Sequence, residues 1–133
     1  MQVTNFLWDG RDPRSLAPLS RLRPDLVLYF GQRQSLACSG FFGPLKAACP
    51  HALVVGCSTG GQFLDGDVVD DQIACLAIRF VETRLRLAQV EVDAAAGSRQ
   101  AGNILARTLA ADDLRGIFVL SDGLHVNGSE LVT

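Results

Sequence analysis

The first segment of this sequence that could carry chemistry is residues 56–62, G-C-S-T-G-G-Q. Ser58, Thr59 and Gln62 offer hydroxyl and amide groups, and the glycines allow backbone N–H groups to approach a bound molecule closely. This combination predicts a polar cradle for a small ligand. The alternative is a tight turn in which Ser58 and Thr59 hydrogen-bond locally, and the residues alone leave both open. No lysine follows in the pattern of a nucleotide-binding P-loop, so that motif is unsupported.

The second such segment is residues 121–129, S-D-G-L-H-V-N-G-S. Asp122 could bind an ammonium group, and Asn127 and Ser129 could meet a carboxylate at the start of a helix. Together these three residues would suit an amino acid. In the alternative, Asp122 braces the turn and Asn127 or Ser129 caps the following helix. The two roles are compatible, because a capping loop at a sheet edge can also form the wall of a ligand site.

Ser58 also matches the G-x-S-x-G pattern of a hydrolase nucleophile, and the chain order of Ser58, Asp122 and His125 fits some hydrolases. That pattern needs a helix directly after the serine, whereas residues 61–67 have the composition of a loop. Asp122 and His125 are three apart in one loop, which we expect to be a poor arrangement for orienting an imidazole. We therefore predict no catalytic residue and no enzyme, with a Ser58 hydrolase as an alternative.

Metal-binding patterns are lacking in this sequence. The acidic residues of the segment 65–71 lack the spacing of a calcium loop, so we predict no metal site there. No two cysteines form a C-x-x-C pair, and small or apolar neighbours surround each one, so we expect reduced thiols in the core. These two groups are Asp65, Asp67, Asp70 and Asp71, and Cys38, Cys49, Cys57 and Cys75.

Apolar runs bounded by glycine and proline predict the strands that position the two polar segments. Residues 73–80 and 83–92 are close enough for a hairpin, and apolar residues at helical spacing predict a helix at 101–109 with Ser98 as its N-cap. Residues 1–24 mix turn signals with a weak helix that Asp12 could cap and that starts at Pro13. The predicted strands are residues 25–30, 52–57, 73–80, 83–92 and 116–120.

This order of elements predicts an α/β fold. We expect a mixed, mostly parallel sheet with a β-hairpin and helices packed on it, incomplete at the C-terminus. Ligands of such sheets bind at the carboxyl ends of parallel strands. Both polar segments follow predicted strands, so we expect them to meet at that edge.

Size and charge limit the class of protein further. The 133 residues fit a single domain. A formal net charge of −2, with dispersed arginines, argues against a nucleic-acid partner. The sequence has no signal-peptide pattern, and its apolar runs are too short to span a bilayer. We predict a cytoplasmic protein with no membrane partner.

Four segments together resemble the N-terminal part of the FIST domain, named for F-box and intracellular signal transduction proteins. Residues 53–62 are similar to the family's strand and its G-C-S-T-x-G-Q turn, and residues 70–80 to the segment that follows. Residues 101–106, A-G-N-I-L-A, are similar to its A-G-x-x-L-A helix. Residues 119–132 resemble its most telling motif, S-D-G-L-x-V-N-G-S-E-L. The resemblance covers about residues 25–132.

The resemblance implies a prokaryotic sensory module that binds a small ligand, amino acids being the usual suggestion. Its partner would be a histidine kinase, a chemoreceptor or a cyclic-dinucleotide signalling protein. Some members of the family bind haem, so a haem-binding gas sensor with His51 or His125 as the iron ligand is another alternative. We otherwise expect no cofactor. The family's domain continues past the N-G-S-E-L helix, so we expect residues 1–133 to be one domain from a truncated or fragmentary module.

Overall fold

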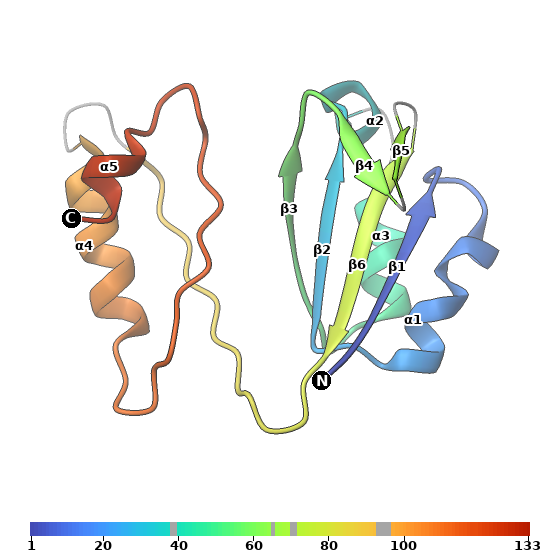
Figure 1. Ribbon diagram of the computed structural model, residues 1–133, viewed down its shortest axis with the longest axis horizontal. Coiled ribbons are helices and arrows are strands. Elements are labelled where there is room, and N and C mark those ends of the chain that lie inside the picture. The colour runs from blue at the N-terminus through green and yellow to red at the C-terminus, as the bar shows by residue number, and fades with distance from the viewer. Residues whose placement is uncertain (38–39, 65, 70–71, 93–96) are drawn as a thin grey trace. The chain divides into compact units, whose positions relative to one another are not determined.

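The computed structural model describes residues 1–37, 40–64, 66–69, 72–92 and 97–133. These residues form two compact units, Met1–Arg84 and Leu85–Thr133. Figure 1 shows the elements within each unit. The assignment of the chain to a single domain stays a prediction.

The first unit is built on a four-stranded sheet of order β1-β6-β2-β3 (Figure 1). Strand β6 is the apolar run I-A-C-L-A-I-R, and four of its first five residues are buried. It lies between β1 and β2 and pairs antiparallel with both, whereas β2 and β3 are parallel. The strands are β1 (Gln2–Trp8), β2 (Leu26–Gly31), β3 (Leu53–Ser58) and β6 (Ile73–Arg79).

This topology confirms the predicted α/β class and mixed sheet, but the sheet is mostly antiparallel, not mostly parallel. Two of its three strand pairs are antiparallel, because β6 lies between β1 and β2 and runs antiparallel to both. Strand β1 was not predicted from the sequence. The hairpin also differs from the one predicted. It joins β4 (Gln62–Leu64) to β5 (Asp67–Val69), so it lies before β6 in the chain rather than after it.

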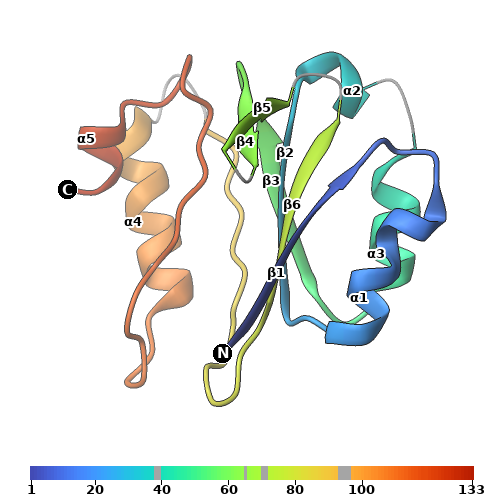
Figure 2. The same cartoon turned by 45° about the vertical axis from the view of Figure 1, so that its right-hand side comes forward.

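Helices cover one face of this sheet. The 3-10 helix η1 (Pro13–Leu16) begins as predicted, because Asp12 Oδ1 accepts the Arg14 N–H at 2.9 Å and Pro13 occupies the first turn. It leads into α1 (Ala17–Leu22), and α1 and α3 (Phe42–Ala48) lie on the same face (Figure 2). The short helix α2 (Arg33–Ala37) follows β2. Beneath the helices lies the core, whose fully buried members include Trp8, Leu19, Val27, Leu45 and Ile73.

The second unit contains α4 (Gly97–Leu109) and α5 (Gly128–Leu131). The helix predicted at 101–109 is confirmed, but Ser98 lies inside its first turn, and its Oγ accepts the Asn127 N–H at 2.9 Å. Helix α5 approaches α4 so closely at Gly102 that a Cβ there would overlap the Leu131 carbonyl oxygen. No helix in the described part of the chain is long and apolar enough to cross a membrane.

The strands predicted at residues 83–92 and 116–120 are not strands in the structure. Both stretches are apolar enough to suggest strands, but a strand exists only where backbone N–H and C=O groups pair with a neighbour. In the second stretch, Ile117 and Phe118 are 44% and 66% exposed. The predicted hairpin between residues 73–80 and 83–92 is therefore wrong as well.

Candidate functional site

Residues 56–62 lie at the carboxyl end of the parallel pair β2 and β3. Gly31 and Ser58 are the last residues of these strands and lie opposite each other, and the Thr59 N–H donates to the Gly31 carbonyl at 2.9 Å. The loop therefore leaves the sheet at the edge where ligands of α/β proteins commonly bind. Ser58 is exposed there, and no described residue is paired with its hydroxyl.

The other two polar residues of this loop are tied into the fold. Thr59 Oγ1 donates to Gln62 Oε1 at 3.1 Å, and Gln62 Nε2 donates to the Gln72 carbonyl at 2.7 Å. Gln62 is only 5% exposed. Its side-chain amide joins the start of β4 to Gln72, the residue before β6. The bond of Thr59 is the local role that the sequence left open for Ser58 and Thr59, whereas that of Gln62 was not foreseen. A role in binding for either stays a prediction.

The glycines of the same loop have different surroundings. A Cβ at Gly56 would overlap the Tyr29 carbonyl oxygen and would lie 2.5 and 2.6 Å from two carbons of the Tyr29 ring. Gly56 is therefore required by packing within the sheet. A Cβ at Gly60 or Gly61 would meet no atom within 4 Å, so these two positions border open space. Only the outer glycines leave room for a bound molecule.

Asp122, in the second unit, forms a close pair with His125. Its Oδ2 lies 2.6 Å from His125 Nδ1, and its Oδ1 accepts the Leu124 N–H at 2.9 Å. The hydrogen bond with His125, and then that with Leu124, lowers the pKa of Asp122 below its usual value. We expected Asp122 and His125, three residues apart, to be poorly arranged for pairing. That expectation is wrong, because the turn places the His125 imidazole within hydrogen-bond distance of the Asp122 carboxylate. Both side chains are more than half exposed.

Asn127 caps helix α5. Its Oδ1 accepts the N–H groups of Ser129 and Glu130 at 3.1 and 3.3 Å. Its own N–H donates to Ser98, which ties the cap to the first turn of α4. Capping by Asn127 rather than Ser129 is thus confirmed, and Ser129 lies exposed in the first turn of α5.

The six predicted site residues fall into two groups. Ser58, Thr59 and Gln62 lie within one loop of the first unit. The other group, Asp122, Asn127 and Ser129, lies within one short stretch of the second unit. A role of these residues in ligand binding stays a prediction for both groups.

The predictions on metals and haem concern other residues. Among the described residues, no three His, Cys, Asp or Glu side chains are grouped to hold a metal ion. His51 is exposed in the turn after α3. Of the acidic cluster, Asp67 begins β5, while Asp65, Asp70 and Asp71 lie outside the described residues. Cys49, Cys57 and Cys75 are free thiols, and Cys38 lies outside the described residues.

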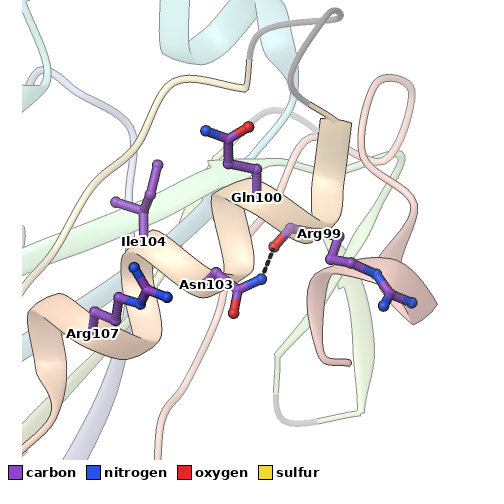
Figure 3. A pocket seen from close by; sticks show the side chains of 5 residues that line it. All are labelled: Arg99, Gln100, Asn103, Ile104 and Arg107. Carbon is purple, nitrogen blue, oxygen red and sulfur yellow. Dashed lines mark hydrogen bonds between the residues drawn. The ribbon is translucent and has the colours of Figure 1, made fainter.

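A hollow of about 420 Å³ along α4 was not predicted from the sequence (Figure 3). Its lining residues are Arg99, Gln100, Asn103, Ile104 and Arg107. Asn103 Nδ2 donates to the Arg99 carbonyl at 3.1 Å, and the side chains of Arg99 and Arg107 extend in different directions (Figure 3). Because the two guanidinium groups do not converge, this hollow does not form a single anion site.

The family model described as FIST N domain matches residues 25–133. This range contains both polar segments and strands β2, β3 and β6, while β1, η1 and α1 precede it. No curated protein and no solved structure matches the chain significantly.

Proposed function

This chain belongs to the FIST N domain family, a family of sensory domains for signal transduction, and from that premise we propose that it binds a small polar ligand and performs no chemistry of its own. The ligand class we propose is amino acids. The signal would pass to a histidine kinase, a chemoreceptor or a cyclic-dinucleotide signalling protein in the cytoplasm. A ligand can signal only if it binds one conformation better than another.

One observation supports the proposal most strongly. At the carboxyl end of β2 and β3, the Ser58 hydroxyl is exposed next to Gly60 and Gly61, which border open space. A hydroxyl beside glycines suits a ligand that approaches the backbone closely. Thr59 and Gln62 would then support the loop, and Asp122, Asn127 and Ser129 remain further candidate contacts.

Isothermal titration calorimetry with a panel of the standard amino acids tests the proposal. We expect saturable heat from at least one amino acid. Substitution of Gly60 by valine should abolish that heat, because the new side chain would occupy the space open to the ligand, while the unfolding midpoint in urea stays the same. Ser58→Ala should weaken binding, whereas Ser20→Ala, at an exposed serine of α1, should leave it unchanged. A panel that gives no heat would refute the proposal.

Hydrolysis with Ser58 as the nucleophile is the second candidate, because Ser58 is exposed at the end of β3 within a G-x-S-x-G sequence. A fluorophosphonate probe tests this directly. Labelling that disappears in Ser58→Ala and persists in Ser20→Ala would establish the enzyme, and an unlabelled wild-type protein would exclude it.

A further inference from the structure

Residues 116–120, G-I-F-V-L, form an exposed apolar stretch that the proposed function does not use. They lie in the extended segment of the second unit that leads to α5 (Figure 1). The exposed fractions of Ile117, Phe118 and Val119 are 44%, 66% and 39%. Consecutive exposed side chains of this kind mark interaction sites more often than inert surface. We call residues 116–120 the apolar stretch.

The backbone of the apolar stretch is open to a partner strand. In the part of the chain that the structure describes, no residue hydrogen-bonds to its peptide groups. Water hydrates exposed peptide groups, so these groups alone do not require a partner. An extended segment nevertheless presents them in a row, as an unpaired sheet edge does, and such a row is a template for a second strand. Isoleucine, phenylalanine and valine also favour strands.

The apolar stretch lacks the features that usually keep such a template from pairing. Natural sheet edges are protected by charged side chains, prolines or bulges. Residues 116–120 contain no charged residue and no proline. Pairing with another extended segment would cover the apolar side chains, and this burial is what would favour association.

The charges that flank the apolar stretch indicate which partner fits. Arg115 precedes it, Asp122 follows it after one serine, and both are exposed. Among the described residues Arg115 forms no ion pair, and its guanidinium donates only to the Leu114 carbonyl at 3.4 Å. Antiparallel pairing of two copies would bring Arg115 of each copy to the end where Asp122 of the other lies. Parallel pairing would place like charges together, which destabilises paired strands.

The sequence of the apolar stretch also suits pairing with itself. In a two-fold symmetric antiparallel pair centred on Phe118, this residue lies opposite its own copy, and Ile117 lies opposite Val119 on either side. Aromatic and β-branched cross-strand pairs of this kind stabilise sheets. In the same register, Arg115 lies one position from the partner copy's Asp122. One arrangement therefore satisfies both the apolar side chains and the flanking charges.

From these observations we infer that the partner of the apolar stretch is a second copy of this chain, and that two copies form a dimer by antiparallel pairing of residues 116–120. Such a contact is isologous, since the same surface serves on both copies. Because it is small, we expect a dissociation constant on the order of 100 µM. The dimer uses no residue of the 56–62 loop, so it does not depend on ligand binding there.

Analytical ultracentrifugation of the full chain from about 10 µM to 1 mM tests the inference. We expect a reversible monomer–dimer equilibrium. Phe118→Lys should raise the dissociation constant at least roughly tenfold, because it places two like charges opposite each other. Val132→Lys is the matched control, since Val132 is 79% exposed in the same unit but outside the apolar stretch, and it should leave the equilibrium unchanged. A wild type that stays monomeric overturns the inference, as does an equal effect of both substitutions.

Charge exchange tests the antiparallel arrangement. Arg115→Glu and Asp122→Lys should each weaken self-association several-fold, because like charges then meet at both ends of the pair. An equimolar mixture of these two variants should dimerise as well as the wild type, since opposite charges meet again at both ends. A mixture no better than either variant alone overturns the inference, and so does an unchanged Arg115→Glu dimer, which parallel pairing would give. Should Phe118→Lys fail to fold, these exposed charge variants decide.

Discussion

Substitution of Gly56 by alanine should destabilise the first unit, although alanine in a strand ordinarily gives a more stable protein than glycine does. In a strand, alanine is favoured over glycine by about 0.5–1 kcal/mol. Overpacking typically costs about 1–3 kcal/mol, and here a Cβ would overlap a backbone oxygen of Tyr29 as well as its ring. A backbone oxygen cannot rotate away as a side chain can, so the upper end of that range applies. The net loss should be roughly 2 kcal/mol.

Urea unfolding measures this loss. With a denaturant dependence of about 2 kcal/mol per molar urea, the midpoint should fall by roughly 1 M. Gly60→Ala is the matched control, because it lies in the same loop, has no atom within 4 Å of the added Cβ and should change stability by less than about 0.5 kcal/mol. A Gly56→Ala protein as stable as the control would refute the packing argument and would return Gly56 to the candidate ligand cradle.

Three further predictions concern other parts of the chain. Gly102→Ala should release α5 from α4, because the new Cβ overlaps the Leu131 carbonyl oxygen; amide exchange in residues 128–131 should accelerate while α4 stays protected. Asn127→Ala should lower the free energy of unfolding by about 1 kcal/mol, and Asn127→Asp should restore most of it. Burial, and secondarily the neighbouring Cys49, raises the pKa of Cys75 from 9.0 to about 12, so iodoacetamide should modify Cys57 before Cys75. Between pH 9 and 12 the folded state then keeps the Cys75 proton, whereas the unfolded state loses it. The free energy of unfolding should therefore fall as the pH rises through that window, and it should fall less in Cys75→Ala.

The strands that the sequence predicts correctly are those with continuous apolar runs, namely β2, β3 and β6. Of these, β6 is mostly buried, whereas the residues of β2 and β3 are mostly half-buried. Strand β1 was missed because only its last three residues, from Phe6 to Trp8, form an apolar run. Residues 83–92 and 116–120 carry the same kind of signal without pairing. Local patterns indicate extended backbone, whereas pairing depends on distant segments.

The candidate site shows the same division between local and distant information. The N-G-S-E sequence is a local capping signal, and Asn127 does cap α5. The Asp122–His125 pair is also local, but it depends on a turn geometry that spacing alone does not reveal. The bond from Gln62 to the Gln72 carbonyl joins two separate stretches, so it could not be foreseen from either segment alone.

The position of β6 has a consequence for how the chain assembles during synthesis. The last strand of the sheet to be translated is one of its two inner strands, and Gln2 pairs with Arg79 across nearly the whole unit. Until the ribosome releases that strand, β1 has no partner and β2 can pair only with β3. Such long-range closure is intrinsically slow and leaves apolar surface open to chaperones in the meantime. The only tryptophan, Trp8, lies in β1 opposite Ile73 of β6. Its fluorescence emission should therefore report when β1 pairs with β6 in the nascent chain.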